Sequence, residues 1–174
     1  PGGRKLHDQE QTTIETRLQE LLEDHSITSS SAPTARSHPD PITSWSESIH
    51  QALESRTLEG MRIVVDCANG AASNFAGPLF TELGAQVETI NASPNGRNIN
   101  ENCGSTNPTQ LREAVLTSQA DLGLAFDGDA DRLVAIASDG ATIDGDRQLC
   151  LFAKDLAQRA QLPNRHVVIT EMSN

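Results

Sequence analysis

The hydrophobic residues of this 174-residue chain follow two patterns in turn, one typical of strands and one typical of helices. Short apolar runs, typical of buried strands, occur at 62–67, 86–90, 122–126, 133–137 and 167–170. Apolar residues spaced three and four apart, which predict amphipathic helices, occur at 8–24, 44–54, 72–83, 108–118 and 146–157. Because strands and helices alternate, the pattern predicts an α/β fold with three layers, α/β/α, around a mixed, mostly parallel sheet.

Single residues mark the ends of several predicted elements. Pro78 should kink or restart its helical stretch, because proline lacks a backbone N–H, and Gly84 should end that stretch. Pro108 should open the next helix, since proline is favoured at the first helical position. Asp146 is predicted to cap the last helix.

Three aspartates follow the strand 122–126. Asp127, Asp129 and Asp131 alternate along the chain, and alternate residues of an extended chain face the same side. Three like charges so close repel one another unless a cation neutralises them. Mg²⁺ prefers carboxylate oxygens and keeps positions open for water and phosphate oxygens. The pattern therefore predicts a magnesium site for phosphate chemistry at a strand end, where open α/β sheets bind ligands.

Neighbouring residues extend this prediction. Arg132 follows the aspartates directly, and a guanidinium beside a metal is well placed to hold a phosphate bidentately. The strand 133–137 follows so closely that it must pair with 122–126 as an antiparallel hairpin. Asp66, at the end of another strand, is expected to shape the turn that follows it rather than to contact a ligand.

Other interpretations of the aspartates remain open. A solvated acidic turn needs only the turn chemistry of Asp and Gly. A calcium loop of the EF-hand type is nearly excluded, because it needs Gly at its sixth position and Glu at its twelfth, where this chain has Arg132 and Ser138. A haloacid-dehalogenase-like phosphatase would use Asp127 as nucleophile and Asp129 as acid/base, although Asp131 stands where that family usually has Thr or Val.

The composition of the chain argues against several classes of binding partner. The net charge of −11 argues against binding to nucleic acid or to anionic membranes, and no apolar run approaches the length of a membrane span. The three cysteines have neither zinc-site spacing nor an even count for disulfides; they are Cys67, Cys103 and Cys150. We therefore expect a reducing, cytoplasmic location.

With these motifs in view, the chain resembles the α-D-phosphohexomutase superfamily. The segments that carry the resemblance are 66–71, 94–100, 103–108, 127–132, 144–146 and 172–174. Their order and spacing match over about residues 44–174, and Pro1–Leu6 resembles the end of the family's first domain. Asn98-Ile99-Asn100 and Cys103-Gly104-Ser105-Thr106 favour the glucosamine branch over the mannose and glucose branches, which remain alternatives.

The resemblance implies an activity. Such enzymes interconvert hexose 6-phosphates and 1-phosphates through a phosphoserine and a bisphosphorylated sugar. For the glucosamine branch, glucosamine 6-phosphate and glucosamine 1-phosphate are interconverted in the synthesis of peptidoglycan precursors. By position, Asp127, Asp129 and Asp131 are implied as Mg²⁺ ligands and Arg132 as a phosphate contact.

The resemblance also divides the chain. Residues 1–24 would end the first domain, 25–43 form a linker rich in Ser, Thr and Pro, 44–164 form the metal-binding second domain, and 165–174 begin the third. The nucleophilic serine is then expected before Pro1, and the loops that recognise sugar and phosphate after Asn174. We expect the chain to supply the metal site without turnover of its own, with the missing domains as partners; a binding module without enzymatic role is the alternative.

Overall fold

The computed structural model describes residues 5–24, 41–54, 56–171 and 173, and the predicted linker 25–43 lies mostly outside them. The chain forms two compact units, 1–39 and 40–174. In the first unit the described structure is one helix, α1 (Asp8–Glu23), which buries none of its side chains. None of the helices in the described ranges has the length and apolar character that a membrane span requires.

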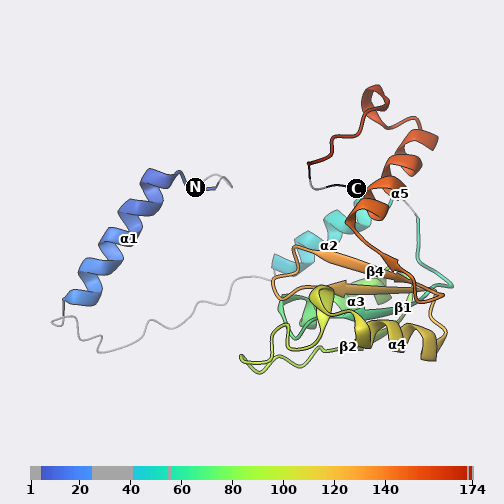
Figure 1. The fold of residues 1–174 in the computed structure, drawn as a ribbon, viewed down its shortest axis with the longest axis horizontal. Coiled ribbons are helices and arrows are strands. Elements are labelled where there is room, and N and C mark those ends of the chain that lie inside the picture. Colours follow the sequence, from blue (N-terminus) through green and yellow to red (C-terminus); the bar gives the residue numbers. More distant parts are fainter. Residues whose placement is uncertain (1–4, 25–40, 55, 172, 174) are drawn as a thin grey trace. The chain divides into compact units, whose positions relative to one another are not determined.

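The second unit is built on a five-stranded sheet in the order β2-β1-β3-β4-β5 (Figure 1). Strand β1 pairs in parallel with the edge strand β2 on one side and with the central strand β3 on the other. β4 and β5 then extend the sheet in antiparallel pairing. The strands are β1 (Arg62–Asp66), β2 (Gln86–Ile90), β3 (Leu122–Phe126), β4 (Leu133–Ala137) and β5 (Thr142–Ile143). The predicted mixed sheet and the hairpin of β3 and β4 are confirmed.

Helices cover both faces of the sheet, as the predicted three layers require. The short helix η1 (Ala71–Asn74) and α3 (Ala76–Glu82) pack on the face that carries Ile63 and Val65. On the opposite face, α4 (Thr109–Ser118) packs with Leu111 and Val115 against Val64. Because successive residues of β1 point to opposite faces, a strand buried on both sides has a continuous apolar run.

Helix ends follow the predicted signals with one exception. The helical stretch after β1 stops at Asn74 and restarts as α3, which contains Pro78 in its first turn. Gly84 follows α3 with φ +100°, the left-handed conformation that ends helices. α5 (Gly145–Gln158) is capped by Asp144, whose side chain accepts a hydrogen bond from the Arg147 N–H, and not by Asp146 as predicted.

The second unit begins with α2 (Pro41–Ala52), which starts three residues before the predicted 44. Its Trp45 ring meets Phe75 edge-on, with ring centroids 5.1 Å apart. The helix is thereby attached to the layer of η1 and α3, and it is continuous with the domain rather than part of the linker.

The predicted strand 167–170 is wrong for the structure described. These residues pair with no strand in the described ranges, and Val168 is 93% exposed. The four β-branched residues favour extended backbone. A strand forms, however, only where the N–H and C=O groups of a neighbouring strand form hydrogen bonds with it. The adjacent α5 also buries no side chain, and its Leu151 and Phe152 are more than half exposed.

Leu111 provides a test of the α4 face. We expect Leu111→Ala to lower the free energy of unfolding by about 3 kcal/mol, because the side chain is fully buried and its loss leaves a cavity. Leu151→Ala, the same change at a half-exposed position on α5, should cost less than about 1 kcal/mol. Urea denaturation of both variants measures this; equal losses would show that α4 does not anchor the sheet.

Candidate metal centre

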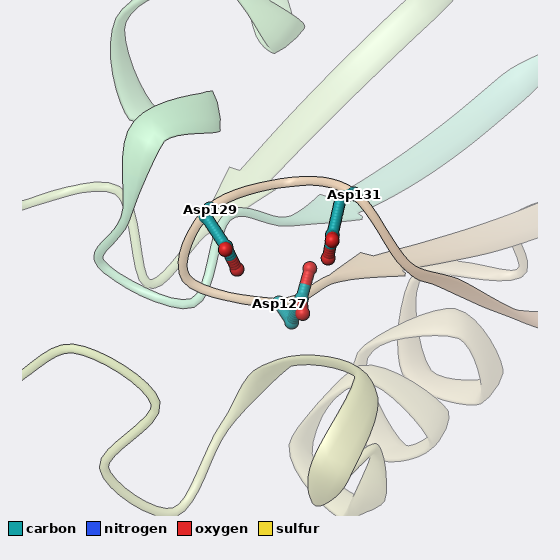
Figure 2. Close-up of side chains that lie close together, drawn as sticks. All are labelled: Asp127, Asp129 and Asp131. Carbon is teal, nitrogen blue, oxygen red and sulfur yellow. The ribbon is translucent and has the colours of Figure 1, made fainter. Parts of the chain in front are cut away.

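The three aspartates lie on the loop that joins β3 to β4 (Figure 2). Asp127 directly follows the half-buried last residue of β3, Phe126, and is itself only 2% exposed. Ala130 has φ +60°, and its N–H bonds to the Asp127 carbonyl oxygen at 3.1 Å. This tight turn folds the loop back over Asp127, so that all three carboxylates point toward one space.

The structure therefore brings together the residues that the alternation singled out. One carboxylate oxygen from each of Asp127, Asp129 and Asp131 lies within 4.8 Å of the other two. Two oxygens on opposite sides of a Mg²⁺ ion are about 4.2 Å apart, so a small closure of the loop suffices to bring all three oxygens into reach. Asp129 and Asp131 are exposed, which leaves the solvent side of the cluster open to water or to a ligand.

Arg132 holds both oxygens of the buried carboxylate. Its backbone N–H donates to Asp127 Oδ1 at 3.1 Å, and its side-chain Nε lies 2.9 Å from Asp127 Oδ2. Burial by itself would raise the pKa of Asp127. Hydrogen bonding, chiefly from the Arg132 backbone N–H, and the guanidinium charge outweigh burial and hold that pKa below its ordinary value. Asp127 is therefore an anion at neutral pH.

One oxygen of this anion has unfilled bonding capacity. Among the described residues, Asp127 Oδ2 is buried and accepts no hydrogen bond; the Arg132 Nε is close enough for an ion pair but its N–H is not aimed at the oxygen. A buried carboxylate oxygen without a hydrogen bond is costly unless a charge compensates it. Together with two exposed carboxylates, it forms a donor set of hard oxygens that fits a divalent cation such as Mg²⁺.

Asp66 fixes the frame beneath the aspartates. Its carboxylate is fully buried at the end of β1, where Oδ1 accepts from the Ala68 N–H at 3.0 Å and Oδ2 from the Gly104 N–H at 2.8 Å. One side chain thus joins the loop after β1 to a segment 38 residues further along the chain. The expectation that Asp66 shapes the turn is confirmed.

Glycines let the segments that Asp66 joins approach the loop 127–132, called the metal loop below, so closely that their backbones are in contact. The Ala71 N–H donates to the Gly128 carbonyl oxygen at 2.8 Å, and a Cβ built on Gly70 would overlap the Gly128 backbone. Gly104 has φ +70°, and a Cβ there would lie 2.5 Å from the Phe126 carbonyl oxygen. No side chain fits at either approach, so glycine is required by contact and, at Gly104, also by conformation.

Sequence reasoning missed two residues beside the metal loop. Ile99 and Asn100 lie over Gly128, where an added Cβ would meet Ile99 Cδ1 at 2.5 Å and Asn100 Nδ2 at 2.8 Å. In the sequence both stand out only as members of a family motif. Their place could not be inferred from spacing, because the link is a backbone bond from Asn100 N–H to the Ala68 carbonyl oxygen, between distant segments.

The nearby cysteines have the opposite chemical character to a nucleophile. Burial and the Asp66 charge raise the pKa of Cys67 to about 11. The same two causes, with Glu101, raise the pKa of Cys103. Both thiols are therefore protonated at neutral pH, and they serve as small apolar groups of the frame.

Comparison with known proteins identifies the family. The family model described as "Phosphoglucomutase/phosphomannomutase, alpha/beta/alpha domain II" matches residues 39–140, more than half of the chain. The chain therefore belongs to this family, and the haloacid-dehalogenase alternative is not supported. The matched segment contains β1 to β4, the three aspartates and Arg132.

Individual relatives are close along nearly the whole chain. The phosphoglucosamine mutase of a Thermoanaerobacter species is 42% identical over 172 residues, which cover 99% of this chain and 38% of that protein. The phosphoglucosamine mutase of Sphingopyxis alaskensis is 43% identical over 175 residues, which cover 100% of this chain and 39% of that protein. The chain thus spans less than half the length of these relatives.

A solved structure agrees with the fold. The crystal structure of a phosphoglucomutase/phosphomannomutase family protein from Burkholderia thailandensis matches with a TM-score of 0.56 and 31% identity. The match covers 66% of this chain and 26% of that chain. The α/β architecture described above is therefore that of the family.

Gly70→Ala tests the close approach of the loops. We expect a loss of about 3 kcal/mol in the free energy of unfolding, because the new Cβ meets rigid backbone rather than a flexible side-chain end. Gly145→Ala is the matched control, since a Cβ at Gly145 meets nothing within 4 Å. Urea denaturation of both variants decides; a Gly70→Ala protein as stable as the control would contradict the described contact.

The lowered pKa of Asp127 predicts a pH dependence of stability. A carboxyl whose pKa is lower in the folded than in the unfolded state contributes stability above about pH 4, and this contribution disappears as the pH falls through the folded-state pKa. We expect the difference in unfolding free energy between the metal-free protein and its Asp127→Asn variant to shrink between pH 6 and pH 3. A difference that stays constant would contradict the assigned ionisation.

Proposed function

We propose that this chain provides the metal-binding domain of a phosphoglucosamine mutase, which interconverts glucosamine 6-phosphate and glucosamine 1-phosphate. The observation that carries the proposal is the cluster of Asp127, Asp129 and Asp131 at the end of β3, within a segment that belongs to the phosphohexomutase family. The names of the relatives favour glucosamine over mannose or glucose as the sugar.

In this proposal the three aspartates hold Mg²⁺. Asp127 is the fixed ligand, because its carboxylate is buried and bonded to the main chain of its own loop. Asp129 and Asp131 approach from the exposed side of the loop. When bound, the ion neutralises negative charge on a phosphoryl group in transfer. Arg132, next to the cluster and with 73% of its side chain exposed, is proposed as a phosphate contact.

The remaining machinery is proposed to lie in other domains. The chain matches 38–39% of the length of the relatives above, so a phosphoserine donor and a bisphosphorylated intermediate belong to the longer protein of the proposal. In the proposal, residues 44–164 belong to the second domain, residues 1–24 to the first and residues 165–174 to the third. Free Cys67, Cys103 and Cys150 support a reducing, cytoplasmic location.

Metal binding is the first test. We expect Mg²⁺ to bind this chain in isothermal titration calorimetry with about one ion per chain, and Asp129→Asn to weaken binding at least about tenfold, because one of three protein ligands becomes neutral. Glu113→Gln, the same charge change at an exposed carboxylate on α4, should leave the affinity unchanged. Equal loss of Mg²⁺ affinity in both variants would mean that the negative charge of the chain attracts the ion without a specific site.

Activity is tested in a chimera. The segment would replace its counterpart in the phosphoglucosamine mutase of the Thermoanaerobacter species, which matches 99% of this chain. We expect the chimera to interconvert the glucosamine phosphates, the chimera with Asp129→Asn to lose activity by orders of magnitude, and the 174-residue chain to be inactive alone. Turnover by the isolated chain, or an active Asp129→Asn chimera, would refute the assignment.

A further inference from the structure

The Arg132 side chain already contacts carboxylates of the cluster, whereas a residue that served only to bind phosphate would leave its guanidinium free. Its Nε lies 2.9 Å from Asp127 Oδ2 and 3.6 Å from Asp131 Oδ1, so the guanidinium contacts two of the three clustered carboxylates. Its main chain meanwhile holds the other oxygen of Asp127, at 3.1 Å. We propose that the Arg132 side chain is a built-in counterion, which neutralises Asp127 in the metal-free protein and has to leave Oδ2 when a divalent cation binds.

The two contacts to Asp127 differ in their freedom to move. The backbone N–H belongs to a loop whose ends are fixed by β3 and β4, so its bond to Oδ1 persists. The side chain is 73% exposed and can rotate away into solvent. Oδ2 accepts no hydrogen bond from any described residue, so it is the oxygen that is available to a cation once the guanidinium has gone.

Electrostatics make the two occupants exclusive. A guanidinium within 4 Å of two metal-ligating carboxylates would repel a divalent ion bound to the same oxygens. Departure of the side chain also frees its planar fork of N–H donors beside the cluster, where it can bind phosphate oxygens. This inference rests on the proposed function: it assigns Arg132 two successive partners, a carboxylate and then a phosphate.

Cation affinity measures the competition. In Mg²⁺ calorimetry without phosphate, we expect Arg132→Gln to bind Mg²⁺ about three- to fivefold more tightly than the unaltered chain, because an ion pair with an exposed, solvent-screened cation is a weak competitor. Arg62→Gln is the control, because it removes the same charge at the first residue of β1, at the edge of the sheet away from the aspartates. The Arg62 side chain donates a hydrogen bond to the Ser118 carbonyl oxygen, and its replacement should leave the Mg²⁺ affinity unchanged. Equal affinities in Arg132→Gln and the unaltered chain, or equal tightening in both variants, would overturn the proposal.

Thermal stability measures the counterion role without relying on cation affinity. In EDTA, Arg132→Gln should lower the unfolding midpoint by about 3 °C, because the buried Asp127 loses its compensating charge. In saturating Mg²⁺ the deficit should vanish, whereas any deficit of Arg62→Gln should be the same in both solutions. An unchanged midpoint of Arg132→Gln in EDTA, or a deficit that Mg²⁺ leaves in place, would overturn the proposal.

The two proposals fail in different ways. If Mg²⁺ neither binds the unaltered chain nor shifts its midpoint, the metal centre of the proposed function is refuted, and with it the competition. If Mg²⁺ binds and Asp129→Asn abolishes binding, but Arg132→Gln behaves like the unaltered chain, the metal centre stands and the counterion role of Arg132 is refuted.

Discussion

Two hydrogen bonds to one buried carboxylate hold the functional edge of this sheet together. Asp66 ends β1, and its carboxylate accepts hydrogen bonds from the N–H groups of Ala68 and Gly104 at the same time. An unpaired carboxylate at this depth would be strongly unfavourable, so both segments are drawn to it. Gly104 in turn lies against the carbonyl oxygen of Phe126, at the end of the strand that leads to the aspartates. The position of the metal loop therefore depends on a residue outside the aspartate cluster.

The arrangement of the side chains above this frame depends on their charges. The carboxylates of the metal loop gather at the end of β3 because the turn at Ala130 folds the loop back over Asp127. Their repulsion is relieved locally by the adjacent Arg132, and its main chain contributes as well as its guanidinium. A single five-residue step, from Asp127 to Arg132, thus supplies both the buried anion of the candidate metal centre and the cation that compensates it.

The sequence predicts this site better than it predicts the segments around it. The alternation of the aspartates after an apolar run is a local pattern, and local geometry carries it into the fold. Asp66 could be expected to shape a turn, but its partner Gly104 lies 38 residues away and leaves no periodic signal. The run 167–170 shows the reverse case: its β-branched residues predict a strand, yet strand formation depends on a neighbour that local propensity does not provide.

The hairpin that carries the aspartates has a consequence for how such chains can vary. Phe126 is paired with Leu133, so the loop has both ends fixed on adjacent, hydrogen-bonded strands. Because side chains alternate with a period of two, one inserted or deleted residue would turn the inward face of β4 outward unless a bulge absorbed it. Substitution can adjust the loop's chemistry, but its length is tied to the packing of the sheet. Variation in the chemistry of this loop is therefore expected to come from changes of side chain rather than from changes of length.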